Sequence, residues 1–153
     1  MKRKGKQENN MIRIFQVPFE VEDIKENITL TTNTGKRSSN EAIISQGLKF
    51  HSQGKIAEAA KFYKYSIEKG FADANIYSNY AVILKRAGNL KEAEIIQRKA
   101  IKLRPDFADG YYNLGNILKD IGNLKESEKS YKKAIEFKQG FPEAYYNLGN
   151  ILR

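Results

Sequence analysis

An internal repeat constrains this chain more than any other feature of its sequence. The stretch Tyr-Tyr-Asn-Leu-Gly-Asn-Ile-Leu at residues 111–118 returns letter for letter at residues 145–152, which is 34 residues further on. Asn-Leu-Lys-Glu likewise follows both Gly88 and Gly122. A fixed period of this size is typical of solenoid proteins, whose units bury their apolar faces against one another. The chain is therefore expected to be a row of similar units.

Rows of 34 residues divide the sequence into units at 40–73, 74–107 and 108–141 and a half-unit at 142–153. Large apolar residues recur at positions 4, 11 and 24 of the unit, and small ones at positions 20 and 27. Spacings of 3, 4 and 7 residues are typical of helices. We predict two helices in each unit, separated by a glycine at position 15. These glycines are Gly54, Gly88 and Gly122.

Position 8 carries only small residues, which is expected where one helix packs closely on another. A larger side chain at Gly115 should overpack that contact. Position 8 holds Gly47, Ala81, Gly115 and Gly149.

The second helix of each unit shows a start signal. Asn89 and Asn123 follow the glycine breaks, with Glu92 and Glu126 three residues later, and this pattern predicts capping boxes. Oppositely charged residues four apart are expected to pair on the outer face of these helices. Such pairs are Glu94 with Arg98 and Glu128 with Lys132.

Taken together, the columns resemble the tetratricopeptide repeat, a 34-residue helix-turn-helix unit with this order of large and small positions and a proline near position 32. The match covers residues 40–153. Departures are Gln46 at position 7, Gln97 at position 24, and a proline at position 32 in one unit alone, Pro105. The resemblance implies an all-α, right-handed α-solenoid whose first helices line a concave surface.

The segment 1–39 differs from the repeats and is predicted to be a basic arm and linker. Two interpretations of residues 12–32 stay open: two short strands, or a partly disordered arm against the first repeat. Charges and Pro18 interrupt the early apolar residues, so no signal peptide is expected. No stretch predicts a transmembrane span, so no membrane partner is expected.

Composition excludes several classes of site. There is no cysteine, so disulfides, thiolate metal sites and Cys-His catalysis are excluded, and with His51 as the single histidine a multi-histidine metal site is excluded too. No Ser-His catalytic arrangement is expected. No phosphate-cradling loop or dinucleotide motif occurs. We therefore expect a noncatalytic, cytoplasmic protein without metal or cofactor. The net charge of +9 and pI near 9.6 favour acidic partners. Lysine-rich helix surfaces also serve solubility, so nucleic acid is a disfavoured partner.

A column of asparagines marks the candidate binding surface. An asparagine side chain offers a donor and an acceptor, so a row of them can pair with the backbone of an extended peptide. The resemblance extends to the asparagine ladder in the repeats of protein O-linked N-acetylglucosamine transferases. Basic residues at position 12 would favour acidic or phosphate-bearing peptides. The predicted peptide-binding residues are Asn79, Asn113 and Asn147 at position 6, Asn116 and Asn150 at position 9, and Lys85 and Lys119 at position 12.

A second binding mode of the family is disfavoured. Repeats that grip the C-termini of chaperones with a carboxylate clamp need lysine at position 5 and asparagine at position 9 of their first unit. This chain has Ile44 and Leu48 there.

Two other functions stay open. The half-unit 142–153 leaves an apolar face at Tyr145, Leu148 and Leu152 without a second helix, which predicts self-association or a chain that continues. The layout also resembles the recognition region ahead of bacterial glycosyltransferase, sulfotransferase or methyltransferase domains. In a further alternative, the repeats are an assembly scaffold whose partners dock at the convex face or the open end. We predict a protein-binding or peptide-binding scaffold.

Overall fold

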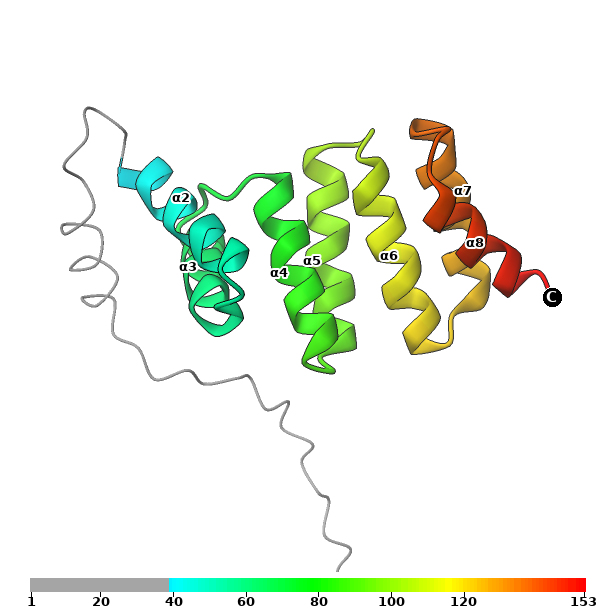
Figure 1. The fold of residues 1–153 in the computed structure, drawn as a ribbon, viewed down its shortest axis with the longest axis horizontal. Coiled ribbons are helices and arrows are strands. Elements are labelled where there is room, and N and C mark those ends of the chain that lie inside the picture. Colours follow the sequence, from blue (N-terminus) through cyan, green and yellow to red (C-terminus); the bar gives the residue numbers. More distant parts are fainter. Residues whose placement is uncertain (1–38) are drawn as a thin grey trace, which may run out of the picture.

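The computed structural model describes residues 39–153, and this part of the chain forms seven α-helices and no strand. Figure 1 shows the helices following one another along the long axis of the molecule, which is the arrangement of an α-solenoid. The predicted all-α solenoid is confirmed, whereas the predicted arm, apart from Ser39, lies outside the described residues. The helices are α2 (Ser39–Ser52), α3 (Ile56–Glu68), α4 (Ala74–Arg86), α5 (Leu90–Leu103), α6 (Ala108–Ile121), α7 (Leu124–Phe137) and α8 (Pro142–Ile151).

The helices pack as hairpins in a row. Helices α2 and α3, α4 and α5, and α6 and α7 pack against each other, and each hairpin also contacts the next through α3 with α4, α5 with α6, and α7 with α8. No helix in the described range is long and apolar enough to cross a membrane.

Each hairpin turns at the predicted glycine. Gly54, Gly88 and Gly122 have φ values of +73°, +81° and +90°, a left-handed region that side chains disfavour. The N–H of Gly122 donates to the carbonyl three residues back (3.0 Å), and the N–H of Asn123 donates to the carbonyl five residues back (2.9 Å). The other two turns repeat both bonds. This is the Schellman motif, which satisfies the last carbonyls of the first helix.

Asn89 and Asn123 are the N-cap residues of α5 and α7, as predicted, but the same turn explains why the reciprocal glutamate bond of a capping box is wrong. A capping-box glutamate must accept a hydrogen bond from the backbone N–H of the N-cap residue, but in Asn89 and Asn123 that N–H already donates to the preceding helix. The side chain of Asn89 makes no capping bond. That of Asn123 accepts one from the Glu126 N–H at 3.4 Å. The Glu126 carboxylate is left to pair elsewhere.

The core lies between and within the hairpins, where the predicted columns meet. The position-24 side chains of Tyr63 and Tyr131 are fully buried, and Gln97 in the same column is buried equally. A Cβ atom added at Gly115 would lie 2.6 Å from Cε1 of Tyr131, so this close helix contact requires glycine. At Gly149, by contrast, an added Cβ meets nothing within 4 Å.

Candidate functional site

The position-6 asparagines connect consecutive hairpins. Asn79, Asn113 and Asn147 lie in the middle of α4, α6 and α8, and all three are half-buried. Each side chain reaches back to a residue of the preceding unit, 16 to 35 residues earlier in the chain. The column therefore contributes hydrogen bonds between repeats before any ligand is considered.

Asn113 is at the end of a buried hydrogen-bond chain. Its Nδ2 donates to Ser78 Oγ (3.0 Å), and Ser78 Oγ donates to Gln97 Oε1 (3.1 Å). The Nε2 of Gln97 then donates to the carbonyl of Gly110 (3.0 Å). Gln97 is completely buried, and both its Oε1 and its Nε2 atoms have a hydrogen-bond partner inside the protein, as burial requires. The off-pattern Gln97 is thereby explained as an inter-repeat connector.

Asn147 makes the corresponding contact one unit later. Its Nδ2 donates to Asn116 Oδ1 (3.1 Å) and lies 3.3 Å from Tyr112 Oη. Asn116 Oδ1 also accepts a hydrogen bond from the hydroxyl of Tyr131 (2.8 Å). Two of the predicted peptide-binding residues, Asn116 and Asn147, are therefore in direct contact with each other.

Between the first and second hairpins, the hydroxyl of the buried Tyr63 is a hydrogen-bond partner of two side chains. Asn79 hydrogen-bonds this hydroxyl, and His51 Nδ1 lies 2.9 Å from it. Burial raises the pKa of Tyr63, and the hydrogen bond with Asn79 partly offsets that rise. The single histidine of the chain therefore contacts a core tyrosine.

The nitrogen and oxygen atoms of the position-6 asparagine side chains differ in whether they already have a partner inside the protein. The Nδ2 groups of Asn113 and Asn147 are used internally, whereas within residues 39–153 their Oδ1 atoms accept no hydrogen bond. Asn150 is exposed and makes no side-chain hydrogen bond in the same range. The Oδ1 atoms of Asn113 and Asn147 are therefore available to a ligand as hydrogen-bond acceptors.

Of the two lysines predicted at position 12 of the binding surface, one is already in an ion pair. Lys85 Nζ forms an ion pair with Asp120 Oδ2 at 2.8 Å, which links α4 to α6. Lys119 is half-buried and forms no ion pair with any described residue. Of the two lysines predicted to attract acidic peptides, Lys119 is the one whose charge is not already matched.

The predicted assembly face is on α8. Tyr145 and Leu152 are 52% and 62% exposed, while Leu148 is half-buried. Self-association through these residues stays a prediction.

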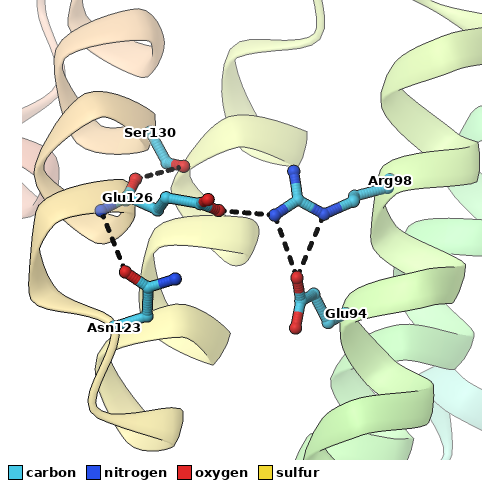
Figure 2. Close-up of polar contacts among 5 residues, drawn as sticks. All are labelled: Glu94, Arg98, Asn123, Glu126 and Ser130. Atoms are coloured by element: carbon cyan, nitrogen blue, oxygen red, sulfur yellow. Dashed lines mark hydrogen bonds and ion pairs between the residues drawn. The ribbon is translucent and has the colours of Figure 1, made fainter.

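The outer face of the second helices carries a polar cluster that the sequence revealed only in part. Figure 2 shows Glu126 of α7 and Glu94 of α5 both reaching the guanidinium of Arg98. The predicted Glu94–Arg98 pair is confirmed at 2.9 Å, and Arg98 also lies 2.6 Å from Glu126. The predicted Glu128–Lys132 pair is present at 2.7 Å. Arg98 thus bridges α5 and α7, a contact between residues 28 apart in the sequence.

Among the described residues no group of three or more histidine, aspartate or glutamate side chains could hold a metal ion. The polar side chains of the repeats instead form hydrogen bonds and ion pairs between neighbouring helices.

Paired helices with Schellman turns, a small residue at position 8 and a fully buried side chain at position 24 of each unit define an α-solenoid of helical hairpins. Two models described as tetratricopeptide repeat match residues 74–107 and 97–129, and one described as TPR repeat matches residues 115–152. Together they span residues 74–152, just over half of the chain. The chain is a tetratricopeptide repeat protein. No curated protein matches it.

Solved structures share this fold at low sequence identity. The first TPR of Spaghetti (RPAP3) bound to the HSP90 peptide SRMEEVD is 23% identical with a TM-score of 0.68, covering 73% of this chain and 89% of that one. MamA is 22% identical with a TM-score of 0.71, covering 85% and 68%. The Sgt2 TPR domain from Aspergillus fumigatus is 20% identical with a TM-score of 0.66, covering 78% and 83%. The resemblance to repeats that precede transferase domains stays a prediction.

Proposed function

We propose that this chain is a noncatalytic protein-interaction module that holds an extended peptide on the surface formed by α4, α6 and α8. The observation that carries the proposal is the column of Asn79, Asn113 and Asn147. Each of these residues occupies the same position in the first helix of its unit. A column with the period of the repeat can meet successive backbone groups of a ligand that runs along the solenoid axis.

The internal hydrogen bonds specify the chemistry of this surface. Because the Nδ2 groups of Asn113 and Asn147 are held by the preceding repeat, the side chains are fixed in orientation and their Oδ1 atoms are left as acceptors. Fixed side chains lose little conformational freedom when a ligand binds. The expected partners of these oxygens are backbone N–H groups, which every residue except proline supplies. Recognition would therefore tolerate many peptide sequences.

Similar folds support a peptide as the ligand, with one difference. The RPAP3 domain carries the acidic HSP90 peptide SRMEEVD. In this chain Ile44 packs against the core, and Leu48 is 43% exposed, where a carboxylate clamp needs lysine and asparagine. We therefore propose recognition of main chain, with Lys119 contributing a preference for acidic residues, in place of capture of a terminal carboxylate.

The test measures binding of the protein to an array of unstructured peptides. Asn113→Ala with Asn147→Ala should weaken binding by about tenfold or more, because each hydrogen bond contributes about 1 kcal/mol. These changes also remove bonds between repeats, so Lys119→Ala with Asn150→Ala provides a second variant that removes no side-chain hydrogen bond or ion pair within residues 39–153. Asn89→Ala is the matched control, because its side chain makes no capping bond in the turn between α4 and α5. Unchanged binding by both double variants, with helical circular dichroism preserved, would refute the proposal.

A further inference from the structure

The outer face of the second helices carries a stripe that the asparagine surface does not use. Positions 18, 22, 26 and 30 of the repeat are four residues apart and therefore lie along one face of a helix. All eight side chains at these positions of α5 and α7 are exposed, with Ile95 and Leu103 57% and 58% exposed. The stripe is Lys91, Ile95, Lys99 and Leu103 on α5, and Lys125, Lys129, Lys133 and Phe137 on α7.

The two stripes belong to one surface. Arg98, three residues after Ile95, forms an ion pair with Glu126 of α7 at 2.6 Å, and this bridge holds the outer faces of α5 and α7 together (Figure 2). Equivalent positions of the two stripes hold Lys91 and Lys125, followed by Ile95 and Lys129. A ligand lying along α5 therefore meets cations from α7 as well.

The charge on this surface is unbalanced because its carboxylates are already paired. Glu94 and Glu126 are held by Arg98, Glu128 by Lys132 and Glu136 by Lys133. Glu92 is the remaining carboxylate of the two helices. Five lysines of the same helices form no ion pair within residues 39–153. They are Lys91, Lys99, Lys102, Lys125 and Lys129.

We infer that the outer face of α5 and α7 is a docking surface for an acidic amphipathic helix of a protein partner. Charge complementarity requires an anionic partner, and the two exposed aliphatic side chains that alternate with Lys91 and Lys99 require one that also supplies apolar groups. Residues four apart along a helix repeat about every 6 Å. A partner helix with glutamate and leucine alternating every four residues therefore matches the lysine and aliphatic residues of α5 in register.

An acidic helix fits this surface better than a nucleic acid or an anionic lipid surface does. Nucleic acid would use the lysines through its phosphates but leave Ile95 and Leu103 exposed to water. A lipid surface would take up protruding apolar side chains, but Ile95 lies between Lys91 and Lys99, and Phe137 is stacked on Tyr111 with ring centroids 5.6 Å apart. The aliphatic residues are placed to contact a ligand that lies along the stripe.

The experiment is fluorescence anisotropy with a labelled, staple-constrained helical peptide that repeats glutamate and leucine four residues apart. We expect binding by the wild type that weakens as salt rises. Lys99→Glu with Lys129→Glu should weaken it by about tenfold or more, and Ile95→Ser by a few-fold. The control, Lys49→Glu with Arg86→Glu, makes the same change in net charge at exposed positions on α2 and α4 and should retain binding. Circular dichroism checks that each variant is folded.

Several results would overturn the inference. One is absence of binding by the wild type, and another is equal binding of a scrambled peptide of the same composition, which would reduce the surface to a general attraction for anions. Equal losses in the stripe and control variants would have the same meaning. Tighter binding to phosphatidylserine vesicles or to a single-stranded oligonucleotide would assign the surface to a different partner. Loss of binding through Asn113→Ala with Asn147→Ala, in a variant that stays folded, would place the peptide on the asparagine column and not on this surface.

Discussion

Glycine at position 8 provides a quantitative test of how the helices pack. An alanine at Gly115 would place its Cβ 2.6 Å from Cε1 and 2.7 Å from Cδ1 of Tyr131. An ordinary contact starts at 3.4 Å, so the ring or the helix must move by about 0.8 Å. The ring has little freedom, because Tyr131 is fully buried and its hydroxyl donates to Asn116 at 2.8 Å. In addition, the carbonyl of residue 115 accepts a hydrogen bond from Ser127 Oγ at 2.7 Å, which ties α6 to α7.

Two opposing effects decide the sign. Overpacking costs about 1–3 kcal/mol, whereas replacing a helical glycine by alanine stabilises a helix by about 1 kcal/mol. Gly115→Ala should therefore lower the free energy of unfolding by up to about 2 kcal/mol. Gly149→Ala is the matched control, because it lies in the same Asn-Leu-Gly-Asn context with nothing within 4 Å of the added atom. That change should be neutral or stabilising. Urea unfolding followed by circular dichroism measures both, and a Gly115→Ala protein as stable as its control would refute the proposed packing.

Three more predictions follow from the buried and bridging polar groups. Gln97→Met should destabilise the fold by about 1–3 kcal/mol, because Ser78 and the Gly110 carbonyl lose buried partners; unchanged urea unfolding would contradict this. A double-mutant cycle of Arg98→Ala and Glu126→Ala should give a coupling below about 1 kcal/mol that fades at high salt, and a salt-independent coupling would mean that the exposed pair is not screened. Burial raises the pKa of Tyr131 to about 12, and burial together with Glu92 and Glu68 raises that of Tyr80 to about 12, both from 10.0. Unfolded tyrosines ionise first, so the free energy of unfolding should be constant below pH 10 and fall between pH 10 and pH 12. A urea midpoint that stays constant over that range would contradict the burial of these hydroxyls.

The parts of the fold that could be predicted are those fixed by steric rules acting at a regular interval. The left-handed turns at Gly88 and Gly122, the buried ring of Tyr131 and the close approach at Gly115 each follow from one residue type in one column. The N-cap positions of Asn89 and Asn123 were also predictable, but the absence of the reciprocal glutamate bond was not. The glycine turn uses the backbone N–H of Asn89 and Asn123, and this competition depends on the conformation of the preceding helix end.

The candidate site was less predictable, because its contacts join different columns. The asparagine column was visible in the sequence, but its partners were not. Asn113 donates to a serine at position 5, whereas the same column holds Ile44 in the unit before and Tyr112 in the unit after. The bridge from Arg98 to Glu126 likewise joins two units, while the helical spacing indicated only its partner four residues away.

Nuclear magnetic resonance of the asparagine side-chain amides tests the central claim most directly. A peptide selected by the array would be titrated into the labelled protein while the signals of Asn113, Asn116, Asn147 and Asn150 are followed. If the asparagine column is the binding surface, all four signals shift as the peptide concentration rises, and those of residues on the outer faces of α5 and α7 do not. Saturable binding that leaves all four amide signals in place would contradict the account.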